Sequence, residues 1–168
     1  DIFVRDRTQG NIFIVSVNSS EEISNSYSGT PSMSSDSRYI AFGSYASNLV
    51  PGDENGVSDI FVRDRVAGTT EIVSVGESGV LGNSYSSNPS ISSDGRYVSF
   101  GSAASNLVSC DENSVSDIFV RDRTQGNTVM VSASLGVPGN AASEKSSISP
   151  NGRYVTFVSY ASNLVAGD

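Results

Sequence analysis

The sequence contains no histidine, one cysteine and one lysine among its 168 residues. The absence of histidine excludes Ser-His and Cys-His nucleophile pairs, imidazole metal ligands and the commonest general base. The single cysteine, Cys110, excludes an intrachain disulfide, so the cysteine content does not indicate a redox compartment. Most hydrolase templates are therefore excluded.

Basic residues and long apolar runs are also scarce. Lys and Arg number 10 against 18 for Asp and Glu, which gives a formal net charge of −8. Binding to a phosphate backbone needs the opposite charge balance, so we expect no nucleic-acid partner. No stretch approaches 18 consecutive apolar residues, so we expect no membrane span.

Internal repetition is the strongest feature of the sequence. The heptapeptide Asp-Ile-Phe-Val-Arg-Asp-Arg begins at Asp1, Asp59 and Asp117, so the interval between starts is 58 residues both times. A fixed period of this length indicates a repeat architecture. We therefore interpret residues 1–168 as a single repeat domain with the units 1–58, 59–116 and 117–168.

Within each unit the apolar residues alternate with a period of two and are bounded by Gly, Asn, Ser and Asp, which predicts strands. For the middle of the chain we expect strands near residues 89–92, 96–102, 117–123 and 71–75, joined by tight turns and two longer loops. Four short antiparallel strands in a unit of this size are typical of a β-propeller blade.

A family resemblance agrees with this prediction. The run from Ser92 to Phe100, followed by Asp117 to Asp122, resembles the WD40-like (PD40) repeat of TolB-type propellers, whose pattern is S-P-D-G-[KR]-x-[IV]-A-F and then [DE]-I-[YF]-V-x-D. All three units match the pattern. The resemblance implies an all-β propeller, usually six-bladed, that serves binding or scaffolding and is sometimes attached to a catalytic domain.

The resemblance also implies an order of strands, a to d, from the ring centre outward. The chain then begins with strands c and d, continues through two complete sets and ends with strands a and b. Three blade equivalents are fewer than the usual four to eight, whereas two copies make six. We therefore predict a homodimer in which residues 146–160 of one chain pair with residues 1–17 of the other, with Asp1 and Asp168 at each junction. The alternative is that the three units belong to a longer propeller.

Two acidic loops are candidates for cation binding. They span residues 53–59 and 111–117, and their oxygen side chains at positions one, three and seven resemble the start of a calcium loop. They lack the further acids of a full EF-hand pattern, so an Asx-rich turn is the alternative. The candidate Ca²⁺ ligands are Asp53, Asn55 and Asp59 in one loop, and Asp111, Asn113 and Asp117 in the other.

The longer loops are expected to share one face of the propeller. Asn25, Tyr27, Asn83 and Tyr85 lie in these loops, and the third unit carries the chain's only lysine, Lys145, nearby. Tyr and Asn suit the recognition of a protein or glycan ligand, and they equally suit loop packing. The Arg and Asp residues of strand c recur in every unit, so we interpret them as ion pairs between strands or blades.

These observations favour a non-enzymatic interaction module that is secreted, periplasmic or on the cell surface. One alternative is a propeller fragment of a glycosidase or peptidase. Its candidate acids are the non-repeated Glu21, Glu22, Glu71, Glu77 and Glu144, which are scattered over outer strands and loops. Another is a duplicated or engineered repeat protein whose only demonstrable property is assembly.

Overall fold

The structure is a computed structural model that describes residues 1–167, apart from the side chain of Ser78. It is an all-β arrangement of antiparallel sheets. The strands are β1 (Phe3–Arg5), β2 (Ile12–Ile14), β3 (Ser28–Met33), β4 (Tyr39–Ser44), β5 (Asp59–Asp64), β6 (Thr69–Ile72), β7 (Ser86–Ile91), β8 (Tyr97–Ser102), β9 (Asp117–Asp122), β10 (Asn127–Met130), β11 (Ala133–Ser134), β12 (Val137–Pro138), β13 (Ser143–Ile148) and β14 (Val155–Ser159), with a 3₁₀ turn, η1, at Glu77–Gly79.

Two four-stranded sheets confirm the predicted strand order. One has the order β3-β4-β5-β6 and the other β7-β8-β9-β10, and every pairing is antiparallel. The outermost strand of the first sheet was predicted at residues 71–75 but runs from Thr69 to Ile72. The reason is the turn before it: Asp64 accepts hydrogen bonds from the Val66 and Ala67 amides, and this tight turn brings Thr69 opposite Asp64.

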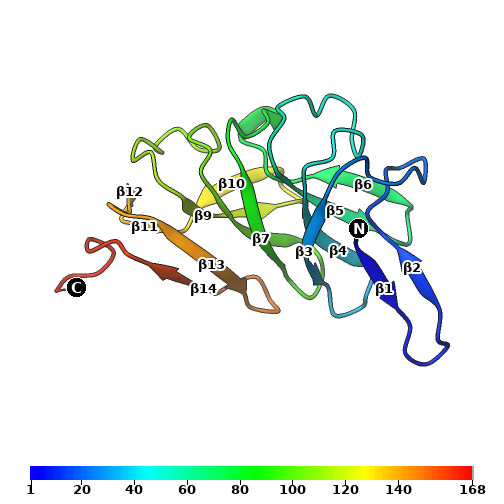
Figure 1. The fold of residues 1–168 in the computed structure, drawn as a ribbon. Coiled ribbons are helices and arrows are strands. Elements are labelled where there is room, and N and C mark those ends of the chain that lie inside the picture. The colour runs from blue at the N-terminus through cyan, green and yellow to red at the C-terminus, as the bar shows by residue number, and fades with distance from the viewer. Residues whose placement is uncertain (168) are drawn as a thin grey trace.

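The two ends of the chain form half-sheets. The pair β1-β2 corresponds to strands c and d of a complete sheet, and β13-β14 corresponds to strands a and b. The two pairs lie at opposite ends of the row of sheets (Figure 1). The small hairpin β11-β12 is an addition that the sequence pattern did not predict.

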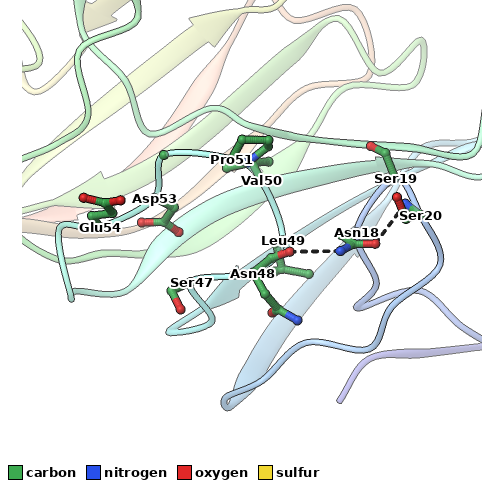
Figure 2. A pocket seen from close by; sticks show the side chains of 11 residues that line it. Asn18, Ser19, Ser20, Ser47, Asn48, Leu49, Val50, Pro51, Asp53 and Glu54 are labelled. Atoms are coloured by element: carbon green, nitrogen blue, oxygen red, sulfur yellow. Dashed lines mark hydrogen bonds between the residues drawn. The ribbon is translucent and has the colours of Figure 1, made fainter.

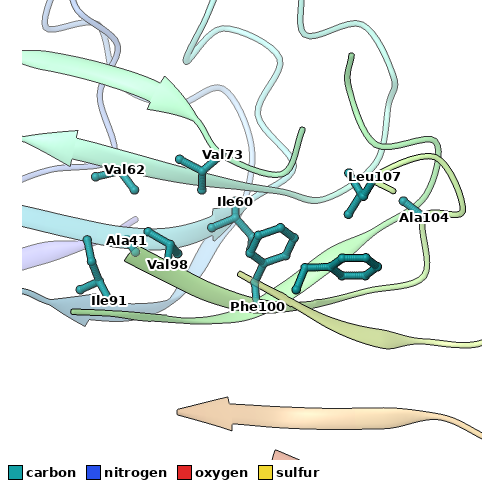
Figure 3. Close-up of a cluster of buried hydrophobic side chains, with 10 residues drawn as sticks. Ala41, Ile60, Val62, Val73, Ile91, Val98, Phe100, Ala104 and Leu107 are labelled. Carbon is teal, nitrogen blue, oxygen red and sulfur yellow. The ribbon is translucent and has the colours of Figure 1, made fainter. Parts of the chain in front are cut away.

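The hydrophobic core lies between the sheets. One cluster joins Ile60 and Val73, from the first four-stranded sheet and the segment after it, to Val98 and Phe100 of β8 and to Leu107 in the loop that follows (Figure 3). All five side chains are fully or almost fully buried. A second cluster packs the half-sheet β1-β2 against β4 and β5. Both faces of the central strands are therefore buried, as expected of a sheet inside a stack of blades.

The innermost strands of successive sheets lie next to one another. β7 packs against β3 and β4, and β13 packs against β7 and β8. The Ile91 amide donates to Ser32 Oγ at 3.2 Å, and the Ile148 amide donates to Ser90 Oγ at 3.1 Å. The a strands of successive sheets thus lie beside one another, which is consistent with their innermost place in the predicted order.

Candidate functional site

Each acidic loop holds two buried carboxylates close together. In the loop between β4 and β5, Asp59 is fully buried and Asp53 nearly so. Asp59 accepts hydrogen bonds from Ser74 Oγ at 2.6 Å and Asn55 Nδ2 at 2.7 Å. Burial, and then the nearby charge of Asp59, raise the pKa of Asp53 to about 6. The loop between β8 and β9 repeats this arrangement with Asp111 and Asp117.

The asparagines of these loops have a different role from the carboxylates. Asn55 donates its side-chain amide to Asp59 and to the Gly82 carbonyl, and its side-chain oxygen accepts the Val57 amide at 3.2 Å. This is the Asx-turn geometry of the alternative interpretation. Asn113 makes the equivalent three contacts. In residues 1–167 no group of three or more His, Cys, Asp or Glu side chains is placed to hold a metal ion.

Asp53 also lines an open hollow of about 320 Å³ between the loop after β2 and the loop after β4 (Figure 2). The walls come from residues 18–20 and from residues 47–54. Asn18 donates to the Asn48 carbonyl at 3.2 Å across the hollow. The walls combine polar side chains with Leu49, Val50 and Pro51, and the hollow is open to solvent.

Asn25 and Asn83, which were predicted to lie on a ligand face, hold two loops together. Asn25 donates Nδ2 to Ser47 Oγ and accepts the Ser47 amide at 3.1 Å, while its own amide donates to Asn48 Oδ1 at 2.9 Å. Asn83 makes the same contacts with Ser105 and Asn106. The third unit repeats them at Asn140. Although these asparagines are exposed, their polar groups are engaged within the protein.

Tyr27, Tyr85 and Lys145 remain available on the surface. Tyr27 is 68% exposed and Tyr85 is 48% exposed, and both precede an innermost strand. Lys145 has a positive φ of 57° at a bulge of β13. Thr30 and Asn88 occupy the equivalent bulges of β3 and β7. The innermost strands therefore present a different side chain at the same bulge in each unit.

Ion pairs confirm the interpretation of the strand c charges in part, because four of these residues, Arg63, Asp64, Asp122 and Arg123, form them. Within one sheet, Arg38 pairs with Asp64 and Arg96 pairs with Asp122.

Two further ion pairs connect different units of the repeat. Arg63 pairs with Glu21, and Arg123 pairs with Glu71. Both glutamates belong to the scattered acids that the hydrolase alternative would need as catalysts. In the structure they serve contacts between units instead.

The junction residues are placed at one end only. Asp1 Oδ1 accepts hydrogen bonds from Ser16 Oγ at 2.9 Å and from Ser24 Oγ at 3.1 Å. Ser74 and Asp59 form the equivalent of the Ser16 contact in the first complete sheet. Asp168 lies outside the described residues.

Sequence reasoning missed the partners of the loop asparagines. Asn48 and Asn106 belong to the recurring Ala-Ser-Asn-Leu-Val segment, which served only as a repeat marker. Asn48 donates Nδ2 to the Ile23 carbonyl, and Asn106 donates to the Leu81 carbonyl. The recurrence of this Ser-Asn pair beside a loop in every unit is the sequence signal that would have identified these partners.

Comparisons with known proteins identify the fold. No protein-family model matches the chain, and no curated protein matches its sequence. Among solved structures, TolB from Acinetobacter baumannii is similar over 96% of this chain and 32% of its own, with a TM-score of 0.57 and 18% identity. A putative TolB from Agrobacterium tumefaciens is similar over 94% of this chain and 50% of its own, with a TM-score of 0.51 and 18% identity.

The chain therefore spans about a third and a half of the length of these two structures. At this identity the likeness shows the fold, a TolB-like β-propeller arrangement, and not an activity. Among the described residues, no helix is long and apolar enough to cross a membrane.

Proposed function

We propose that this chain is a non-enzymatic propeller module whose two half-sheets are completed by a second copy, giving a six-bladed ring. The proposal rests on one observation: the half-sheets at the two ends carry complementary unpaired edges. Within residues 1–167, β14 lacks the strand c partner that β4 and β8 have, and β1 lacks the strand b partner that β5 and β9 have. Proteins generally pair, cover or charge such edges.

The complete sheets supply the register for this pairing. Tyr39 lies opposite Asp64, Phe42 opposite Phe61 and Ser44 opposite Asp59. The second sheet has the same register. The same register at the junction would place Tyr154 opposite Asp6, Phe157 opposite Phe3 and Ser159 opposite Asp1 of the other copy.

The exposure of the aromatic residues supports this register. Phe42 and Phe61 stack with ring centroids 6.0 Å apart, and both are fully buried. Their equivalents at the chain ends are Phe157, which is half-buried, and Phe3, which is 60% exposed. Joining the two edges would bury both rings, and removal of apolar surface from water is the main favourable contribution to association.

Charge complementarity supports the same pairing. Arg38 and Arg96 each bind the aspartate at the end of strand c, Asp64 or Asp122. Arg153 is the equivalent arginine on the open edge and is exposed. Its expected acceptor is Asp6, which already holds the Thr8 and Gln9 amides through Oδ1, as Asp64 holds the amides of its own turn.

The closed ring would gather the loop face of six blades around one channel. We propose that this face binds a protein or glycan through the exposed Tyr27 and Tyr85, with Lys145 on the innermost strand. The role of the module is then recognition rather than catalysis. A location outside the cytoplasm belongs to the same proposal and rests on the family resemblance alone.

The first experiment is the absolute mass in solution, by light scattering on a sizing column. We expect twice the chain mass of 17.5 kDa, and that mass should stay constant over a wide range of concentration. A stable monomer would overturn ring closure. So would a mass that keeps growing with concentration, because it indicates open chains of subunits.

The matched variants are Arg153→Glu and Arg38→Glu. Arg153→Glu should convert the dimer to a monomer with unchanged circular dichroism, whereas Arg38→Glu, inside a complete sheet, should lower the stability of the chain itself. Lys145→Glu makes the same charge change away from the paired edges and should leave the mass unchanged. Turnover of generic glycoside or peptide substrates by the purified chain would contradict the non-enzymatic role.

A further inference from the structure

The loop between β8 and β9 contains an unusual oxygen atom. Asp111 is only 6% exposed, and its Oδ1 has no hydrogen-bond partner. It is the one buried side-chain oxygen or nitrogen without a partner in the part of the chain that the structure describes. Buried polar atoms are nearly always paired, and an unpaired carboxylate oxygen is among the least favourable exceptions.

A second buried carboxylate, that of Asp117, acts on Asp111 through its charge. Asp117, the first residue of β9, is fully buried, and its two oxygens accept hydrogen bonds from Ser132 Oγ at 2.5 Å and Asn113 Nδ2 at 2.7 Å. Burial and the charge of Asp117 raise the pKa of Asp111 to about 6, and a hydrogen bond from the backbone amide of Asn113 only partly opposes this rise. None of the four ion pairs between described residues involves either aspartate.

A similar carboxylate pair occurs 58 residues earlier in the chain, but neither of its aspartates has a buried oxygen without a partner. Asp53 is also 6% exposed, and Asp59 is fully buried beside it. Asp59 is held by Ser74 and Asn55, the equivalents of Ser132 and Asn113. The two loops differ elsewhere, for example in Gly56 against Ser114, yet both keep the carboxylate pair. The pair is therefore a built feature of the repeat.

We propose that the carboxylate pair of Asp111 and Asp117 binds one divalent cation of the calcium type. Two negative charges match a divalent ion, and the donors available are hard oxygen atoms, which calcium prefers. Calcium tolerates irregular sites and completes its shell with backbone carbonyls and water, so two carboxylates per loop are sufficient protein charge for a weak site. The asparagine amides orient the buried aspartate and are not ligands.

Calcium binding at this pair does not depend on ring closure, since the loop lies inside the chain. The test uses the full chain after dialysis against EDTA, titrated with CaCl₂ by calorimetry at neutral pH and followed by thermal unfolding. We expect one calcium ion per chain, with a dissociation constant of about 10⁻⁴–10⁻³ M, the range of weak protein sites. Saturating calcium should raise the unfolding midpoint by several degrees, because the ion binds the folded state only.

The variants make the assignment specific. Asp111→Asn should lose the calcium ion, whereas Asp53→Asn, the same change in the other loop, should keep it. In EDTA each variant should be at least as stable as the parent chain, since a buried charge has been removed. Glu112→Gln changes the exposed neighbouring carboxylate and should keep the ion. No saturable binding up to about 10 mM CaCl₂, or unchanged binding in Asp111→Asn, would overturn the proposal.

Discussion

Arg38 and Asp64 form a two-point ion pair within one sheet. Arg38 Nε donates to Asp64 Oδ1 at 2.9 Å, and Arg38 Nη2 donates to Asp64 Oδ2 at 2.7 Å. Arg96 and Asp122 repeat this geometry one unit later. The pair joins the start of strand b to the end of strand c, so it fixes the register at that end of each complete sheet.

The Asp64 carboxylate should make the stability of the chain depend on pH. The hydrogen bonds from Arg38, and then the Ala67 and Val66 amides, lower the pKa of Asp64 to about 2 against the opposing effect of burial. Because the folded pKa is below the unfolded value, the ionised form stabilises the fold above about pH 4, and this stability is lost as the pH falls toward 2. Asp64→Asn should lower the free energy of unfolding at pH 7 by about 1–2 kcal/mol.

Chemical denaturation at several pH values tests this expectation. The difference between Asp64→Asn and the parent chain should shrink steadily between pH 4 and pH 2. Glu112→Gln is the control, because it removes an exposed carboxylate that takes part in none of the ion pairs between described residues. A difference that stays constant with pH would show that the ion pair is not the cause.

Ser37 should weaken the proposed junction between two copies. A Cβ at Gly95 would lie 2.1 Å from the ring of Tyr39, and one at Gly152 would lie equally close to Tyr97. In the proposed ring, Ser37 takes this glycine position against Tyr154 of the other copy, and it also has a positive φ of 59°. Ser37→Gly should therefore allow the tyrosine ring to pack against this position. We expect the dimer dissociation constant to fall about tenfold, equivalent to about 1.4 kcal/mol.

The control for this variant is Ser114→Gly. Ser114 has a φ of 58° and lies where the preceding unit has Gly56, away from the junction. Both variants relieve the same backbone strain, so at concentrations where the chain is monomeric both should shift the thermal midpoint similarly. Only Ser37→Gly should lower the dissociation constant measured by analytical ultracentrifugation, and equal dissociation constants would contradict the proposed junction contact.

Two equivalent phenylalanines separate folding from assembly. Phe61→Ala removes a fully buried ring that stacks on Phe42 and should lower the free energy of unfolding by about 3–5 kcal/mol. Phe3→Ala, the equivalent change on the open edge, should leave the monomer's stability nearly unchanged and weaken the dimer. Urea denaturation of the chain at low concentration measures the stability of the monomer, and sedimentation measures the strength of the dimer. A large loss of monomer stability in Phe3→Ala would argue against an open edge.

The loop asparagines should contribute to stability and not to recognition. Asn83→Ala removes the side-chain bonds to Ser105 and should lower the free energy of unfolding by about 1–2 kcal/mol and speed proteolysis in the two loops. Tyr85→Ala, two residues away on the exposed surface, should leave both properties unchanged and affect only ligand binding. Equal effects of the two variants on proteolysis would contradict the role of Asn83 in holding the two loops together.

The strand pattern could largely be predicted from the sequence, because the alternation of apolar residues and the recurring turns act locally. The roles of the candidate site residues could be predicted less well. Asn25 was predicted on a ligand face from its position in a loop, yet its bonding partner Ser47 is 22 residues away. Asn55 was grouped with the calcium ligands from its spacing alone, whereas its side chain closes an Asx turn. Spacing identifies which residues share a loop but not the direction of their polar atoms.

The sequence by itself determined the repeat, the four-strand unit and the position of the half-sheets, because each depends on the order and period of residues. Only the tertiary structure decided which carboxylates are buried. Asp111 is only 6% exposed, and its loop is held by a segment distant in sequence, since Asn113 donates to the Gly139 carbonyl. The unpartnered oxygen of Asp111 is a property of this packing. Burial and hydrogen-bond geometry are sums over such distant neighbours, so no local pattern contains them.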